Sequence, residues 1–114
     1  MALTPIPRVY NSRDSGQPKL GDGEERTVAL APGIPATAKA AVINLTITET
    51  VAAGYVAVFP ANVPWPGNSS INWSDGGQIL ANSVVTAVDA TGTIAIHGGV
   101  GRTHVVIDVQ GYLL

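Results

Sequence analysis

Residues 40–48 read Ala-Ala-Val-Ile-Asn-Leu-Thr-Ile-Thr, and the second half of this stretch alternates apolar with polar side chains. In an extended chain Ile43, Leu45 and Ile47 fall on one face. The polar side chains fall on the opposite face, and they are Asn44, Thr46 and Thr48. A period of two is typical of a β-strand with one buried face. We therefore expect a strand whose isoleucine and leucine side chains face a core.

Seven further runs are short, rich in Val, Ile, Thr and Ala, and bounded by some of the 13 glycines and 8 prolines. The eight strands expected are Arg8–Asn11, Arg26–Ala31, Ala40–Thr48, Tyr55–Phe59, Ser70–Trp73, Ile79–Val88, Thr93–His97 and His104–Tyr112. Short strands separated by Gly-containing turns indicate a sandwich or a barrel. The fold class expected is all-β, an eight-stranded antiparallel sandwich that is jelly-roll-like and carries an extended N-terminal arm.

The chain length fits one domain, because 114 residues fall within the usual size of about 100–150 residues. We expect a single sandwich domain over residues 8–114 and an extended arm over residues 1–7. Two prolines hold the arm extended and supply no donors to a sheet. Apolar side chains in the arm have no evident role in solvent. The arm residues predicted to contact a partner subunit are Leu3, Pro5, Ile6 and Pro7.

Charge and cysteine content exclude several classes of function. A net charge of −2 with six Lys and Arg argues against binding to nucleic acid, which needs a basic surface. No run approaches the roughly 20 apolar residues of a membrane span. Residues 1–10 lack the basic and apolar regions of a secretory signal, so we expect none. Without cysteine there is no disulfide, zinc–thiolate site or thiol nucleophile. Only 12% of residues are charged, which suits a surface covered by other subunits.

The two histidines, His97 and His104, flank a glycine-rich segment that is predicted to be a hairpin turn. Across such a hairpin they would face each other like a two-histidine metal site. A protein zinc site needs three or four ligands, and Asp108 lies about 13 Å further along the strand from His104. A structural hydrogen-bonding role is therefore favoured over metal binding. Ser70 completes a formal triad with His104 and Asp108, but no nucleophile motif surrounds it. We expect no enzyme activity, no metal and no cofactor.

Several polar residues lie in or beside predicted strands, and we interpret them as buried groups that satisfy the backbone of loops. They are Asn44, Asn72, Asn82 and Asp108. Arg8 or Arg13 is predicted to be the charge partner of Asp108.

Both tryptophans fall in the segment 64–73, although aromatic residues make up only 5% of the chain. Trp73 is expected to pack on the sheet. Trp65 lies in a Pro-rich loop, where an exposed indole ring can contact a subunit, pack on the loop or stack on a sugar. Contact with a partner subunit is the role predicted for Trp65.

A set of short motifs runs through almost the whole chain from Arg8. They are Arg8-Val9-Tyr10-Asn11-Ser12-Arg13, Asn44-Leu45-Thr46, Gly54-Tyr55 with Pro60, Ser69-Ser70-Ile71-Asn72-Trp73, Ala81-Asn82 and the closing His104-x-x-x-Asp108-x-x-Gly111-Tyr112. This set resembles the surface-protein repeats of actinobacteria and their phages. Those repeats carry Asp and Thr at the opening positions where this chain has Asn11 and Ser12. The resemblance implies a binding module, which in bacteria is secreted, often tandem and wall-associated.

A single unit without a signal resembles a phage virion protein more than a secreted bacterial one. The function predicted is a non-enzymatic virion structural protein, a capsid decoration protein of an actinobacterial phage. It would be made in the host cytoplasm and lie on the virion surface, bound to the major capsid protein or other virion subunits. A homo-oligomer is expected, with a trimer as one option. The alternative is a carbohydrate- or cell-wall-binding module of a phage tail fibre or a bacterial surface protein, located at the cell surface.

Overall fold

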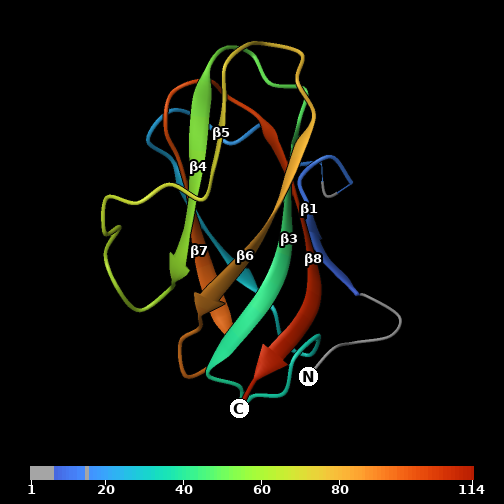
Figure 1. Ribbon diagram of the computed structural model, residues 1–114, viewed down its shortest axis with the longest axis vertical. Coiled ribbons are helices and arrows are strands. Elements are labelled where there is room, and N and C mark those ends of the chain that lie inside the picture. The colour runs from blue at the N-terminus through green and yellow to red at the C-terminus, as the bar shows by residue number, and fades with distance from the viewer. Residues whose placement is uncertain (1–6, 15) are drawn as a thin grey trace.

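Two four-stranded antiparallel sheets pack face to face in the computed structural model, which describes residues 7–14 and 16–114 (Figure 1). The described residues contain no helix. The strands are β1 (Arg8–Asn11), β2 (Glu25–Ala29), β3 (Ala40–Thr48), β4 (Gly54–Pro60), β5 (Ile71–Trp73), β6 (Leu80–Ala87), β7 (Thr93–Gly98) and β8 (His104–Leu113). The eight-stranded antiparallel sandwich is confirmed, and every predicted strand lies within two residues of its observed ends.

The first sheet has the strand order β1-β8-β3-β6, and the second has the order β2-β7-β4-β5. Only the connection from β4 to β5 joins neighbours in one sheet, and the other six cross between the sheets. The hairpin predicted over residues 98–103 is therefore wrong, because β7 and β8 belong to different sheets. Glycines mark a reversal of the chain but do not specify which sheet the next strand joins. That the arrangement is a jelly roll stays a prediction.

The core lies between the sheets and is built around β3. As predicted, Ile43, Leu45 and Ile47 point into it and are fully buried. They share one apolar cluster with inward side chains of the second sheet, such as Ile94 and Ile96. Thr48 is expected on the outer face but is also buried, and its carbonyl accepts a 3.0 Å bond from the Thr103 hydroxyl.

Glycines allow the loops at one end of the sandwich to touch through their backbones. A Cβ on Gly54 would lie 1.8 Å from the carbonyl oxygen of Val100, so no other residue fits there without moving that loop. Gly101 has a φ of +78°, a conformation that glycine adopts at little cost. The Val51 amide donates to the Arg102 carbonyl at 2.9 Å. Loops from both sheets are thereby joined at this end.

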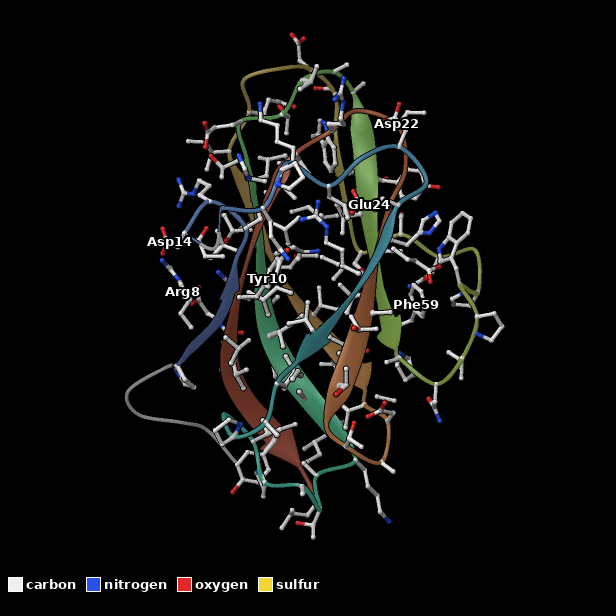
Figure 2. All side chains as sticks on the ribbon, turned by 180° about the vertical axis from the view of Figure 1, so that it is seen from behind. Arg8, Tyr10, Asp14, Asp22, Glu24 and Phe59 are labelled. Atoms are coloured by element: carbon white, nitrogen blue, oxygen red, sulfur yellow. The ribbon has the colours of Figure 1, made fainter. Side chains whose placement is uncertain are left out.

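The polar loop between β1 and β2 closes one side of the sandwich, and Arg26 holds it in place. The Arg26 side chain is 11% exposed, and its Nε donates to the Glu24 carboxylate at 2.8 Å. Its other nitrogens donate to the Tyr10 hydroxyl at 3.0 Å and the Pro18 carbonyl at 2.8 Å. Figure 2 shows Tyr10 on β1 and Glu24, the residue just before β2, on this side of the molecule. Sequence reasoning did not identify this network, because Tyr10 and Arg26 lie in different sheets and meet only when the sheets pack.

We predict that Trp73→Ala lowers the free energy of unfolding by about 3–5 kcal/mol, since the ring is 6% exposed and fills the core. The exposed Asn72 on the same strand is the matched control, and Asn72→Ala should cost about 0.5 kcal/mol or less. Urea unfolding followed by circular dichroism measures both. Equal losses in the two variants would contradict the assignment of Trp73 to the core.

Candidate functional site

A polar hollow of about 310 Å³ lies on the outer face of the first sheet and is lined by Arg8, Asn44, Asp108 and Gln110. Arg8 and Asp108 occupy facing positions on β1 and β8, and Arg8 Nε lies 2.8 Å from Asp108 Oδ1. This hydrogen bond, with the charge of Asp108, raises the pKa of Arg8 above its usual value. The ion pair is open to solvent and therefore adds little stability.

The predicted charge partner of Asp108 is therefore Arg8. Arg13 instead lies 4.0 Å from the Glu49 carboxylate at the edge of the polar loop. Its backbone amide also donates to the Asn11 side chain at 3.1 Å, which fixes the turn after β1.

Several polar residues of the short motifs form hydrogen bonds with one another. The opening and closing motifs meet through Arg8 with Asp108 and through Ser12 Oγ with His104 Nδ1, the latter at 2.9 Å. Within single motifs, Asn44 Nδ2 donates to Thr46 Oγ1 at 3.3 Å and Asn72 Nδ2 donates to Ser69 Oγ at 3.2 Å. Between two motifs, Asn82 Nδ2 donates to the Ser70 carbonyl at 3.0 Å. The polar residues of the motifs thus bond mainly within one strand, loop or sheet, and of these bonds only the one from Asn82 to Ser70 links the two sheets.

The interpretation of the four strand residues as buried groups is corrected. Asn72 and Asn82 are exposed, while Asn44 and Asp108 are half-buried. Asn44 and Asp108 face each other on adjacent strands and line the outer hollow, which keeps both in contact with solvent. Of the bonds described for these side chains, only that of Asn82 reaches a backbone carbonyl.

Trp65 lies over the outer face of the second sheet and is half-buried, where an exposed ring was expected. Its ring stacks on His97 with centroids 4.0 Å apart and planes 11° apart, and lies 6.1 Å from the ring of Tyr55. The indole N–H donates to the Asn68 carbonyl at 3.0 Å. Beneath it is a small apolar cluster of Ala57, Phe59 and Ala95. The loop between β4 and β5 is therefore fixed onto the sheet by this tryptophan.

The stack of Tyr55, Trp65 and His97 forms an aromatic surface bordered by Glu25, whose Oε1 lies 3.3 Å from His97 Nδ1. A side chain at Gly99 would enter the Tyr55 ring at 2.2 Å, so glycine is needed beside the stack. Aromatic rings next to polar groups are the composition that carbohydrate sites use, and also that of subunit contacts.

The two histidines do not face each other across a hairpin, which corrects the arrangement considered from the sequence. His97 lies on β7 in the second sheet and His104 on β8 in the first. Over residues 7–14 and 16–114, no three His, Cys, Asp or Glu side chains are grouped as a metal ion requires. The formal triad is not assembled either, because the Ser70 hydroxyl accepts a bond from the Val58 amide while His104 contacts Ser12.

Ser12 and His104 form a hydrogen-bonded pair that sequence reasoning did not identify. The hydroxyl of Ser12 is fully buried, and it accepts the Val105 amide at 2.9 Å. Burial lowers the pKa of His104, the Glu49 carboxylate opposes this shift, and nearby cations including Lys19 add to it. The pair thus joins β8 to the turn after β1, and its buried hydroxyl is not open to a substrate.

The predicted arm contacts Leu3, Pro5 and Ile6 lie outside the described residues. Pro7 is half-buried, and its carbonyl accepts a 2.9 Å bond from the Val109 amide. It therefore extends the pairing of β1 with β8 within the chain, and its contact with a partner stays a prediction.

No helix in the described part of the chain has the length and apolar character needed to cross a membrane. Comparison with known protein families finds no family model that matches the chain, and a search of curated proteins finds no similar sequence. The resemblance to actinobacterial surface repeats therefore stays a prediction from the motif residues.

We predict that protonation of His104 destabilises the fold. In the folded protein the pKa of His104 is lowered below the usual 6.5. At pH values just below 6.5 the unfolded chain therefore binds more protons at this residue than the folded chain does. Stability from this group is therefore complete above pH 6.5 and is lost as the pH falls through the window.

Urea titrations of the wild type and His104→Gln at a series of pH values measure this contribution. The difference in free energy of unfolding between the two should shrink as the pH drops below about 6.5, because glutamine does not titrate. A difference that stays constant or grows toward acid pH would contradict the prediction.

Proposed function

We propose that the chain is a non-enzymatic structural protein of a virion, a decoration protein on the outside of an actinobacterial phage capsid. In this role it binds the major capsid protein or other virion subunits and stabilises the head. It is made in the host cytoplasm and resides on the virion surface.

The observation that carries the proposal is a surface rich in exposed apolar side chains and poor in charge. Charged residues make up 12% of the chain, and Arg8, Arg13 and Arg26 each face an acidic partner within it. The large apolar side chains exposed are Val51, Val63, Ile79, Leu80, Val85, Val100, Leu113 and Leu114. Such a surface favours a protein that spends its working life covered by other subunits.

Two further features support a structural role. The serine and histidine sets considered from the sequence do not assemble into catalytic geometry, and the Ser12 hydroxyl is buried. The strand order, with β8 between β1 and β3 and β7 between β2 and β4, supports a jelly roll. Jelly rolls occur in viral capsid proteins and also in lectins, so the fold alone does not separate the two uses.

The second candidate is a carbohydrate- or cell-wall-binding module of a tail fibre or a bacterial surface protein. The stacked rings of Tyr55, Trp65 and His97 favour it, because flat aromatic rings beside a carboxylate suit a sugar face. In a decoration protein the same aromatic surface would serve as a subunit contact.

Electron microscopy of the parent phage particle tests the leading proposal. We expect density for the sandwich on the outer surface of the head, and loss of that density from particles that lack the chain. Purified protein should rebind such particles, and deletion of residues 2–6, which retains Pro7, should weaken rebinding without lowering the melting temperature. Density at the tail, or none on the particle, would contradict a capsid role.

A glycan array probed with the wild type and Trp65→Ala tests the second candidate. The decoration proposal predicts that no glycan binds the wild type in a way that depends on Trp65. Circular dichroism verifies that the wild type and the variant are both folded. Specific binding that disappears in Trp65→Ala would replace the capsid proposal with a wall-binding function.

A further inference from the structure

The two sheets have four edge strands, and three of them carry features that oppose pairing with another chain. β1 has only four residues, bears Arg8 and loses its regular register with β8 between Arg8 and Tyr10. β2 bears Glu25 and Arg26 and is flanked by the polar loop that Arg26 holds. β5 is three residues long. Charges, irregular register and short length are the usual protections of an exposed sheet edge.

The fourth edge, β6, has none of these protections. Its sequence is Leu-Ala-Asn-Ser-Val-Val-Thr-Ala, with no charge, proline or glycine over eight residues. It pairs along its whole length with β3 on one side. Within residues 7–14 and 16–114, no other strand pairs with it, so its second side presents free backbone groups. An open edge of this length and composition is a template for a further strand.

Apolar side chains are exposed along the same edge. Ile79 is 71% exposed just before β6, and Val85 is 65% exposed on its outer face. Leu80 is also exposed, although it faces the fully buried Ile47 across the β3–β6 pair. The opposite side of the sandwich, in contrast, is closed by the loop around Arg26. The apolar residues on the β6 side therefore lack the cover that the loop provides elsewhere.

We propose that a second copy of this chain covers the edge, with β6 pairing antiparallel to β6 about a two-fold axis. An uncharged strand meets its own copy without placing like charges opposite each other. Facing residues of an antiparallel pair share one side of the sheet, so the residue on the axis must face its own counterpart. If the two-fold axis passes through Ser83, Val85 lies opposite Ala81 of the second copy. If it passes through Val84, Val85 lies opposite Ser83 of the second copy. The two first sheets then become one continuous eight-stranded sheet.

This contact is isologous and closes at two copies, so a trimer would require a different surface. The inference does not rest on the proposed function, because it concerns the isolated protein. Failure to bind a capsid would leave it intact, and a monomer could still bind one.

Sedimentation equilibrium over a concentration series, with matched lysine variants, tests the proposal. Val85→Lys places a charge on the edge, whereas Val100→Lys places one on an end loop at a valine of almost equal exposure, 63% against 65%. We expect a wild-type dimer, at least tenfold weaker association for Val85→Lys and unchanged association for Val100→Lys. Circular dichroism and thermal melts verify that both variants fold. A wild type that stays monomeric to about 1 mM, or equal weakening by both variants, would overturn the proposal.

The absence of native cysteine allows an independent test of the register. A disulfide needs Cβ atoms about 3.5–4.5 Å apart, a separation found only at or next to the two-fold axis. We expect rapid oxidation to a covalent dimer for one of Ser83→Cys and Val84→Cys, and slow oxidation for Val100→Cys. Equal rates at all three positions, or no cross-linking on β6, would overturn the paired edge.

Discussion

Burial of the inner face of β3 is the constraint on which the rest of the structure depends. β3 lies between β8 and β6 and pairs with both. The alternation of apolar and polar side chains along β3 therefore determines which face of the first sheet points into the core. Once Ile43, Leu45 and Ile47 enter the core, Asn44 must lie outside, beside Asp108. A slip of one residue would exchange the two faces and expose three fully buried side chains.

The strands were predictable from sequence because their signals are local, whereas the contacts between them were not. The alternation around Leu45 and the positions of glycine and proline located all eight strands. The sheet to which each strand belongs depends on packing, which explains why residues 98–103 were misread as a hairpin. Ser12 with His104, and Arg26 with Tyr10, are separated in sequence and meet only in the folded chain. The sequence leaves Arg8 and Arg13 as candidate charge partners of Asp108, and the structure shows the ion pair with Arg8.

The motif residues and the aromatic surface of this protein lie largely in different places. Arg8 bonds to Asp108 and Ser12 bonds to His104, so these residues of the opening and closing motifs have a role in the fold. A search for a ligand guided by these motifs would therefore examine structural contacts. The aromatic surface around Trp65 lies largely outside the motifs, and its composition suits recognition of a partner. A motif with a structural role need not mark the site of function.

Because the chain has few charged residues, few of them can protect the edges of its two sheets from pairing with other chains. The protecting features are also unequally distributed over the four edge strands. Three edges carry charge, irregular register or short length, while β6 carries none. Hydrogen exchange of the wild-type protein, measured by mass spectrometry at low and high concentration, tests most directly whether β6 is the assembly edge. Amides in residues 79–88 should gain protection as concentration rises, while those in residues 8–11 and 25–29 should not change. Exchange in residues 79–88 that is independent of concentration, or protection gained at the other edges, would contradict this assignment.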